Sequence, residues 1–272
     1  MNRLEKKMLG CLEDLRDNYN VIGIKAEFEA EGTRMEEALR LKEIVTMADL
    51  GLTIKIGGCE AVKDMLDAKV IGTRAIVGPM IETAYAMTKY VKTAQFSFSE
   101  DEREEMDFLI NIETITGFEN LDSITEAPEF EHIDGIVVGR VDMTGSLGLG
   151  RDQINSERIF EMTNIMAKKM QAMGKKLVVG GGVSAESLPF FRRLPAGSLA
   201  KYETRKIIFD ATRSLHSEKA PEGLIKAVGF ELMWLKNKRD FYGNIFKEDA
   251  ERINMLETRY EKLLKEAKAL CC

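Results

Sequence analysis

The amino-acid sequence predicts an α/β protein, a (β/α)8 barrel of the TIM type with an added C-terminal helical hairpin. The chain has 272 residues, and α/β barrels commonly need roughly 250. Predicted strands alternate with predicted helices, which is typical of βαβ units in a parallel sheet. Eight such units fit a closed barrel better than an open sheet. No Gly-x-Gly-x-x-Gly motif follows the first strand, so a dinucleotide-binding fold lacks its main signature.

The chain opens with an amphipathic helix, because Leu4, Met8, Leu12 and Leu15 recur at helical spacing. Short apolar runs then predict strands at Val21–Phe28, Leu52–Gly57, Ala75–Met80, Gln95–Ser99, Phe108–Ile112, Ile136–Val141, Lys176–Gly180 and Ser198–Tyr202. Helices are predicted between and after them at Thr33–Leu50, Glu60–Ala68, Thr83–Val91, Phe118–Thr125, Ser156–Met173, from Ser184, and at Ile208–Leu215. Together these elements make a barrel domain over residues 1–220.

Residues 221–272 form a predicted helical extension outside the barrel, with helices at Glu222–Phe241 and Glu248–Leu270. The second helix carries an apolar stripe at alternating spacings of three and four: Ile253, Leu256, Tyr260, Leu263, Ala267 and Leu270. Such a stripe needs a partner, which is either the chain's own barrel or a neighbouring subunit. Because an exposed stripe is a liability on a monomer, we expect a homo-oligomer that uses this extension.

The composition is that of a soluble globular protein, with 44% hydrophobic and 31% charged residues. No apolar run is long enough for a membrane span, and the charged N-terminus has no signal-peptide pattern. A net charge of −6 without a basic stripe argues against nucleic-acid binding. We expect free thiols in a reducing cytoplasm at all four cysteines: Cys11, Cys59, Cys271 and Cys272. With only His132 and His216, histidine-rich zinc chemistry is disfavoured.

Charged and polar residues follow the predicted strands, where barrel enzymes place their catalytic groups. They are Glu27, Glu29, Glu31, Lys55, Asn111, Glu113, Arg140, Asp142, Glu203, Arg205 and Lys206. A divalent cation between Glu113 and Asp142 explains that pair, because hard cations take carboxylate oxygens; salt bridges at the rim are the alternative. The glycine run through Gly181 and Gly182 suits an anion site that Arg205 joins, or else allows close packing.

Several segments resemble the class II pyruvate aldolases, the family that also holds the citrate lyase beta subunit. They are Thr53–Lys55 (TIK), Gly78–Thr83 (GPMIET), Asn111–Thr114 (NIET), Phe118–Asp122 (FENLD) and Ile133–Gly148 (IDGIVVGRVDMTGSLG). The resemblance runs from about Val21 to about Arg205 and leaves the C-terminal extension uncovered. It implies that Glu113 and Asp142 ligate Mg²⁺ or Mn²⁺, which chelates pyruvate, and that the backbone N–H groups of Val141 and Asp142 help to bind the pyruvate oxygens.

Two departures from the family pattern concern the catalytic groups. The family's enolate-stabilising arginine on the second strand is Lys55 here, and lysine lacks the bidentate guanidinium fork; Lys55 either pairs with an oxyanion or neutralises nearby glutamates. The family's Asp/His base pair is missing from the stretch 25–31. A carboxylate can act as the base where burial or like charges raise its proton affinity. Glu29 is the first candidate for this role and Glu27 the second.

The resemblance implies a metal-dependent carbon–carbon lyase that forms or uses a pyruvate enolate with an aldehyde acceptor, either phosphorylated or not. Phosphoenolpyruvate or an acyl-CoA thioester as substrate is the alternative, and a non-catalytic barrel that binds a partner through its C-terminal helices is a third hypothesis. Small-molecule substrates, namely a 2-oxo acid and an aldehyde, are the expected partners. Candidate substrate-binding residues are Asn111, Arg140, Val141, Gly181, Gly182 and Arg205.

Overall fold

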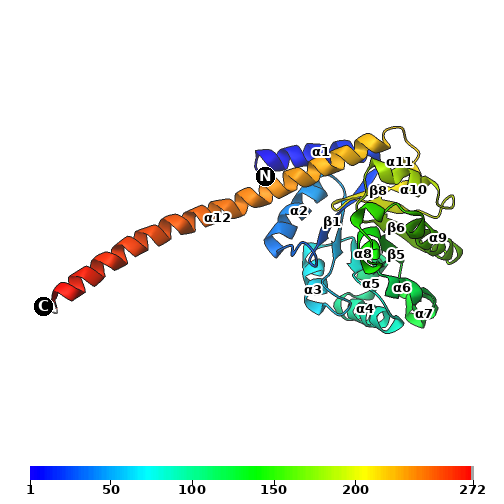
Figure 1. Ribbon diagram of the computed structural model, residues 1–272, viewed down its shortest axis with the longest axis horizontal. Coiled ribbons are helices and arrows are strands. Elements are labelled where there is room, and N and C mark those ends of the chain that lie inside the picture. Colours follow the sequence, from blue (N-terminus) through cyan, green and yellow to red (C-terminus); the bar gives the residue numbers. More distant parts are fainter. Residues whose placement is uncertain (271–272) are drawn as a thin grey trace. The chain divides into compact units, whose positions relative to one another are not determined.

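The computed structural model describes residues 1–270, without the side chains of residues 268–270. This part of the chain divides into two compact units, Met1–Glu231 and the residues from Leu232 onward (Figure 1). No helix within residues 1–270 combines the length and apolar composition that crossing a bilayer requires. Cys11 and Cys59 are free thiols, as predicted, whereas Cys271 and Cys272 lie outside the described residues.

The first unit contains a closed eight-stranded barrel with the strands in sequence order, which confirms the predicted fold. Each strand from β1 to β6 pairs in parallel with the next, whereas β8 is antiparallel to both β7 and β1. The strands are β1 (Val21–Glu27), β2 (Gly51–Lys55), β3 (Ala75–Gly78), β4 (Asp107–Ile112), β5 (Gly135–Gly139), β6 (Lys176–Gly180), β7 (Lys201–Glu203) and β8 (Ile207–Asp210). The carboxyl ends of the seven parallel strands therefore meet at one mouth.

Helices surround the strands in the order of the chain (Figure 1). The α-helices are α1 (Arg3–Tyr19), α2 (Met35–Met47), α3 (Val62–Ile71), α4 (Ala84–Ser97), α5 (Glu100–Glu104), α6 (Ile115–Glu119), α7 (Leu121–Glu126), α8 (Arg140–Ser146), α9 (Glu157–Ala172), α10 (Leu188–Arg192), α11 (Ala211–Ser214) and α12 (Ala220–Leu270). Short 3-10 turns are η1 (Pro128–His132), η2 (Arg151–Gln153) and η3 (Ala185–Ser187). The predicted first helix is confirmed as α1, which buries Met8, Leu12 and Leu15.

Two predicted elements of the barrel are wrong. Gln95–Ser99 is not the fourth strand, because residues up to Ser97 continue α4 and bury Val91 and Ala94. The predicted helix Ile208–Leu215 is wrong over its first half, because Ile207–Asp210 is the strand that closes the barrel. Both segments are short and apolar, and periodicity cannot separate a strand from a helix over so few residues. The predicted total of eight strands was right, although one of its members was not.

Branched side chains from adjacent parallel strands fill the barrel interior with a buried layer of Val77, Leu109, Val137 and Val178. This filling is typical of closed α/β barrels. At Gly135 a Cβ atom would lie 2.1 Å from the carbonyl oxygen of Lys176, so only glycine fits between β5 and β6 at that position. The packed interior holds the loops after the strands in fixed relative positions.

The second unit is a single helical segment, since α12 runs unbroken through 51 residues. The predicted hairpin is therefore wrong. The expected break lies around Gly243, and one exposed glycine costs a helix only about 1 kcal/mol, so it does not end α12. Phe246, Ile253, Leu256, Tyr260 and Leu263 are each more than half exposed. The members of the predicted stripe up to Ala267 thus face solvent in the isolated chain, whereas the side chain of Leu270 lies outside the described residues.

Candidate active site at the mouth of the barrel

A cavity of about 340 Å³ opens at the carboxyl ends of the parallel strands. Nearly all of the predicted site residues line it, from the ends of six strands (β1, β2, β4, β5, β6 and β7) and the loops that follow them. They are Glu27, Glu29, Lys55, Asn111, Glu113, Val141, Asp142, Gly181, Gly182 and Arg205. Glu203, which the sequence placed at a strand end, also lines the cavity, together with four residues that sequence reasoning did not select: Lys25, Arg151, Val228 and Glu231. The structure therefore gathers the predicted chemistry in one place.

Glu113 lies at the floor of this cavity, directly after β4, and is only 2% exposed. Its carboxylate accepts hydrogen bonds from Asn111 Nδ2 at 2.6 Å and from the backbone N–H of Met80 at 3.1 Å. Gly139 makes room for it, because a Cβ atom there would lie 2.5 Å from Glu113 Oε2. Burial raises the pKa of Glu113, and the nearby charge of Asp142 adds to that rise, whereas Lys55 opposes it.

The backbone of Met80 is itself unusual, with a φ of 48°. A non-glycine residue in this left-handed region carries strain, which proteins retain mainly where the backbone has a specific task. Here that conformation accompanies the N–H donated to Glu113. The loop after β3 thus helps to set the position of the buried carboxylate.

Asp142 lies in the first turn of α8, after β5, and its side chain is exposed beside the cavity. Among residues 1–270, no group of three or more histidine, cysteine, aspartate or glutamate side chains is arranged to hold a metal ion. Glu113 and Asp142 would therefore fill only part of a coordination shell. That suits Mg²⁺ or Mn²⁺, because hard cations accept carboxylate oxygens and keep waters or substrate oxygens in the remaining positions.

An orphaned acceptor beside this pair supports the same fit. Asn111 is 4% exposed, and its Oδ1 is buried with no hydrogen-bond partner in the described chain. Because Asn111 Nδ2 donates to Glu113, the amide orientation is set and Oδ1 remains an acceptor. A buried carbonyl oxygen without a donor is unfavourable unless a ligand, ion or water completes it. The donor set at the cavity floor thus consists of hard oxygens.

Lys55 joins Glu113 to Glu29. Its ammonium lies 3.2 Å from Glu113 Oε1 and 2.9 Å from Glu29 Oε2. Although burial opposes the charge, these carboxylates raise the pKa of Lys55 above its ordinary value. Glu29 Oε2 is buried and close to this ammonium, yet it accepts no well-directed hydrogen bond from the described residues. Lys55 is therefore a fixed positive charge rather than a nucleophile.

Lys25 is a buried cation that sequence reasoning did not select. Its ammonium lies 2.6 Å from Glu203 Oε1 and 3.2 Å from Glu27 Oε1. Although burial opposes the charge, Glu203 and Glu27 raise the pKa of Lys25. The spacing of two between Lys25 and Glu27 could have found it, because alternate residues of a strand share one face. The side chains of Lys25 and Glu27 therefore both face the barrel interior.

The loop between β7 and β8 adds two more cations. Arg205 is half-exposed and lies 3.9 Å from Glu27, 4.0 Å from Glu31 and 3.7 Å from Glu231. Lys206 is almost fully buried and is paired with Glu31. Burial lowers the pKa of Lys206, and Glu31 counteracts that shift. These cations are engaged with carboxylates of β1, its following loop and α12.

Arg140 does not line the cavity, so the predicted substrate contact of its side chain is not supported by the geometry. The side chain is fully buried and donates to the carbonyls of Gly180 at 3.1 Å and Gly181 at 2.9 Å. Its guanidinium lies 5.0 Å and 4.9 Å from the ring centroids of Phe190 and Phe191. Burial lowers the pKa of Arg140. Arg140 is a positioning residue that holds the loop after β6.

The glycine run after β6 packs closely against α8. Gly181 has a φ of 79°, and a Cβ atom there would lie 2.6 Å from the backbone nitrogens of Arg140 and Val141. At Gly182, with a φ of 62°, a Cβ atom would lie 2.7 Å from Ile154. Neither position tolerates a side chain, which supports the packing interpretation of this run. The anion-site interpretation stays a prediction.

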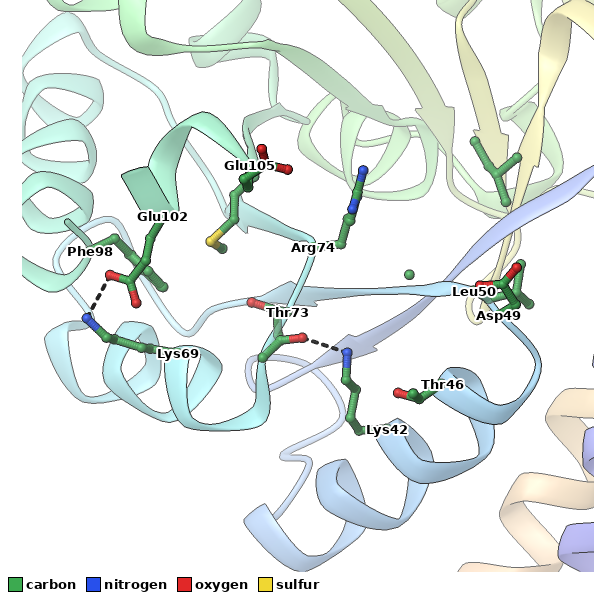
Figure 2. Close-up of a pocket in the computed structure, with 14 residues that line it drawn as sticks. Lys42, Thr46, Asp49, Leu50, Lys69, Thr73, Arg74, Phe98, Glu102 and Glu105 are labelled. Carbon is green, nitrogen blue, oxygen red and sulfur yellow. Dashed lines mark hydrogen bonds and ion pairs between the residues drawn. The ribbon is translucent and has the colours of Figure 1, made fainter. Parts of the chain in front are cut away.

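A larger cavity of about 690 Å³ lies at the opposite end of the barrel, where β2 and β3 begin (Figure 2). In it, Lys69 contacts Glu102 at 2.8 Å and Lys42 donates to the carbonyl of Gly72 at 2.6 Å (Figure 2). It contains none of the predicted site residues. Barrel enzymes use the carboxyl ends of their strands, so the smaller cavity is the candidate active site.

Comparison with known proteins agrees with this assignment. The family model described as HpcH/HpaI aldolase/citrate lyase matches residues 36–177, more than half of the chain. A 2-keto-3-deoxy-L-rhamnonate aldolase from Klebsiella pneumoniae subsp. pneumoniae is 26% identical over 143 residues, which cover 44% of this chain and 50% of that protein. The chain thus spans about half the length of this curated relative.

Solved structures with the same fold share little sequence with the chain. Citrate synthase SbnG has a TM-score of 0.60 at 16% identity, with 86% of this chain and 90% of that one covered. An HpcH/HpaI aldolase from Desulfitobacterium hafniense DCB-2 has a TM-score of 0.57 at 14% identity, with 68% and 77% covered. A family protein from Burkholderia cenocepacia J2315 has a TM-score of 0.52 at 15% identity, with 68% and 88% covered. At these identities the likeness shows the fold alone.

Proposed function

Because the chain belongs to the HpcH/HpaI aldolase/citrate lyase family, we propose that it is a metal-dependent carbon–carbon lyase, a class II aldolase. It forms or uses a pyruvate enolate, with an aldehyde as the acceptor. The observation that carries the proposal is the position of Glu113 and Asp142 beside one cavity at the carboxyl ends of the strands. Lys55, next to Glu113, supplies the adjacent positive charge.

Glu113 and Asp142 are the residues that would hold a magnesium or manganese ion. When bound, the cation supplies a Lewis acid that polarises the 2-oxo group of pyruvate. The backbone N–H groups of Val141 and Asp142 begin α8 beside the cavity, where they suit the pyruvate oxygens. Asn111 orients Glu113 through Nδ2 and presents Oδ1 as a buried acceptor.

We assign the proton transfer at C3 of pyruvate to Glu29, with Glu27 as the second candidate. Glu29 Oε2 lies 2.9 Å from Lys55 Nζ but accepts no well-directed hydrogen bond from the described residues. Glu27 has two cations beside it, because Lys25 contacts it at 3.2 Å and Arg205 lies 3.9 Å away. Although burial opposes the effect, Lys25 and Lys55 lower the pKa of Glu27, which weakens it as a base. Lys55 is assigned to stabilise the enolate oxygen.

A second candidate reaction uses phosphoenolpyruvate or an acyl-CoA thioester in place of free pyruvate. The family description, which includes citrate lyase, leaves this reaction open, and the fold shared with citrate synthase SbnG, at a TM-score of 0.60, is compatible with it. The mouth of the barrel carries more carboxylates than cations, which disfavours substrates with several negative charges. We therefore place free pyruvate first.

The assembly and location of the chain are also proposals. We propose a homo-oligomer formed through the exposed stripe of α12, in which Ile253, Leu256, Tyr260 and Leu263 are each more than half exposed. Burial of this stripe in a neighbouring subunit would remove apolar area that a monomer leaves in water. A cytoplasmic location and the use of small-molecule substrates complete the proposal.

The test is proton exchange at pyruvate C3 without any aldehyde present. The full chain is mixed with MgCl₂ or MnCl₂ and pyruvate in deuterated water, and the methyl signal is followed by proton NMR on quenched, chelator-treated samples. The signal should fade only when protein and metal are both present, and Glu113→Gln should abolish the loss. Glu119→Gln changes an exposed glutamate of α6 and is the matched control. Metal-independent exchange, or none with either metal, would refute the proposal.

A further inference from the structure

A cluster of charges lies at the mouth, on the side of the barrel across from Glu113 and Asp142, and five of its seven members line the cavity. In a closed barrel of eight strands, β8 and β1 lie opposite β4 and β5. We call this set the acceptor-side cluster, and its members are Lys25, Glu27, Glu31, Glu203, Arg205, Lys206 and Glu231. Four of them are carboxylates and three are cations. The metal pair would hold pyruvate, so this side is left for the second substrate.

Every cation of the cluster is already engaged with carboxylates. Lys25 contacts Glu203 at 2.6 Å and Glu27 at 3.2 Å, and Lys206 is paired with Glu31. Arg205 has carboxylates of β1, its following loop and α12 within 4.0 Å. A phosphate group entering here would have to displace one of these carboxylates or meet it as a like charge. The charged groups therefore oppose an anionic acceptor.

Glu231 is the carboxylate of the cluster whose negative charge is least compensated by neighbouring cations. Its side chain, from the first part of α12, lines the cavity and is 22% exposed. Among the described residues, its ion-pair partner is Arg205, whose Nε lies 3.7 Å away, beyond hydrogen-bond length. Burial raises the pKa of Glu231, and its interaction with Arg205 does not fully offset that rise. A ligand cation beside Glu231 would provide the missing compensation.

The two features that had suggested a phosphate site do not point to one in this geometry. Arg205 lines the cavity, but three carboxylates lie 3.7–4.0 Å from its guanidinium, and an entering phosphate would meet them as like charges. The glycines of the run, Gly181 and Gly182, are needed for close packing against α8 and Ile154. Besides Arg205 and the paired lysines Lys25 and Lys55, the cations that line the cavity include Arg151, on the 3-10 turn η2. It does not reverse the excess of carboxylates at the mouth.

We propose that the acceptor-side cluster selects an aldehyde that carries a protonated amine, with Glu231 as the residue that binds the ammonium group, and that it disfavours phosphorylated aldehydes. This inference rests on the proposed aldolase function and names the class of its acceptor. Lys25, Glu27 and Glu203 form the fixed, mutually compensated part of the wall. Glu231 supplies the negative charge that distinguishes an amine from a neutral group of similar size.

The experiment compares three aldehydes of equal chain length, namely 3-aminopropanal, propanal and 3-oxopropyl phosphate. Pyruvate consumption by the full chain with MgCl₂ is followed by proton NMR, and kcat/KM is obtained for each aldehyde. We expect 3-aminopropanal to be preferred over propanal by about ten-fold or more, the discrimination typical of one charged hydrogen bond. The phosphorylated aldehyde should be the poorest of the three.

Two variants change the cluster in opposite directions. Glu231→Gln keeps the size of the side chain and should reduce the amine preference about ten-fold. Arg205→Gln removes a half-exposed cation and should increase that preference. The control Glu251→Gln alters an exposed glutamate further along α12 and should leave all three rates unchanged.

The outcomes separate this inference from the proposed function. A preference for 3-oxopropyl phosphate, or an amine preference that survives Glu231→Gln unchanged, would overturn the inference. Metal-dependent exchange of pyruvate protons without turnover of 3-aminopropanal would also overturn it, while the aldolase proposal would stand. Absence of that exchange in the wild-type chain would instead count against the proposed function itself.

Discussion

Replacing Arg140 with methionine tests how the loop after β6 is held at the mouth. The two side chains are both long and unbranched, but methionine cannot donate a hydrogen bond. The carbonyls of Gly180 and Gly181 would each lose the donor that now lies at 3.1 Å and 2.9 Å. Asn155 Oδ1 and Ser187 Oγ, which also accept from Arg140, would lose a partner as well.

The expected loss in the free energy of unfolding follows from the buried acceptors that Arg140→Met leaves without a donor. Each carbonyl left unsatisfied costs about 1–3 kcal/mol, so two cost about 2–6 kcal/mol. Part of this destabilisation is offset, because methionine does not carry the buried positive charge of Arg140, whose desolvation is unfavourable. No carboxylate would be left without its partner, since the groups that contact Arg140 are neutral oxygens and aromatic rings. We therefore expect the free energy of unfolding to fall by about 3 kcal/mol, which lowers Tm by roughly 6–12 °C in a domain of this size.

Urea denaturation of the full chain, followed by circular dichroism, measures the change in the free energy of unfolding. Pyruvate proton exchange on the same variant, at a temperature where it stays folded, reports the position of the loop and should slow. Arg140→Lys keeps the charge but not the fork, and should lie between wild type and Arg140→Met. Arg193→Met is the control, because Arg193 also lies over a phenylalanine ring but is half-exposed. A methionine variant as stable as wild type would refute the reasoning.

Four further predictions concern the metal, the base, the assembly and the pH dependence of stability. Glu113→Gln should abolish Mn²⁺ binding in calorimetric titration while circular dichroism stays unchanged; retained binding would remove Glu113 from the metal site. Glu29→Gln should slow pyruvate proton exchange by about two to four orders of magnitude, and a wild-type rate would move the base elsewhere. Light scattering should give a mass well above the 30.6 kDa of one chain, and Leu256→Lys should lower it; a monomeric wild type would contradict the oligomer. Although burial opposes ionisation, Lys176 and Lys201 lower the pKa of Asp107, so its stabilising effect is complete above an ordinary pKa of about 3.9 and is lost as pH falls through the lower folded value. Asp107→Asn should therefore flatten the fall in unfolding free energy below about pH 4, and parallel curves would refute this.

The residues around the proposed metal site could be predicted from the sequence, because each lies in or next to a strand that the local sequence pattern reveals. Asn111 lies near the end of a buried apolar strand, Glu113 directly follows that strand, and Lys55 ends another. In a parallel barrel, the end of any such strand faces the mouth regardless of how the remaining chain folds. Knowledge of the strand positions was therefore enough to bring these three residues together.

The acceptor side depends on contacts that no local pattern contains. Glu231 lies on a helix beyond the segment that resembles the family, and it reaches the mouth only through the path of α12. Glu203 ends a strand of three residues whose neighbour β8 was predicted as a helix. Arg140 follows a strand, as a catalytic residue would, yet its long side chain turns away from the cavity to the loop of the next strand. In each case the side chain's role was set by a tertiary partner.

The antiparallel β8 explains why the acceptor side carries so many charges. A parallel eighth strand would end at the mouth, whereas β8 starts there, so the short loop before it brings Arg205 and Lys206 beside β1. β8 then ends at the far end of the barrel, where Gly223 of α12 lies against Tyr19 and Phe209. From Gly223 to Glu231 a helix rises about 12 Å, and four residues of strand span about 13 Å. The return path of α12 thus matches the length of β8 and brings Glu231 to the mouth, so the reversed strand supplies both the cations of the cluster and the carboxylate proposed to bind the acceptor.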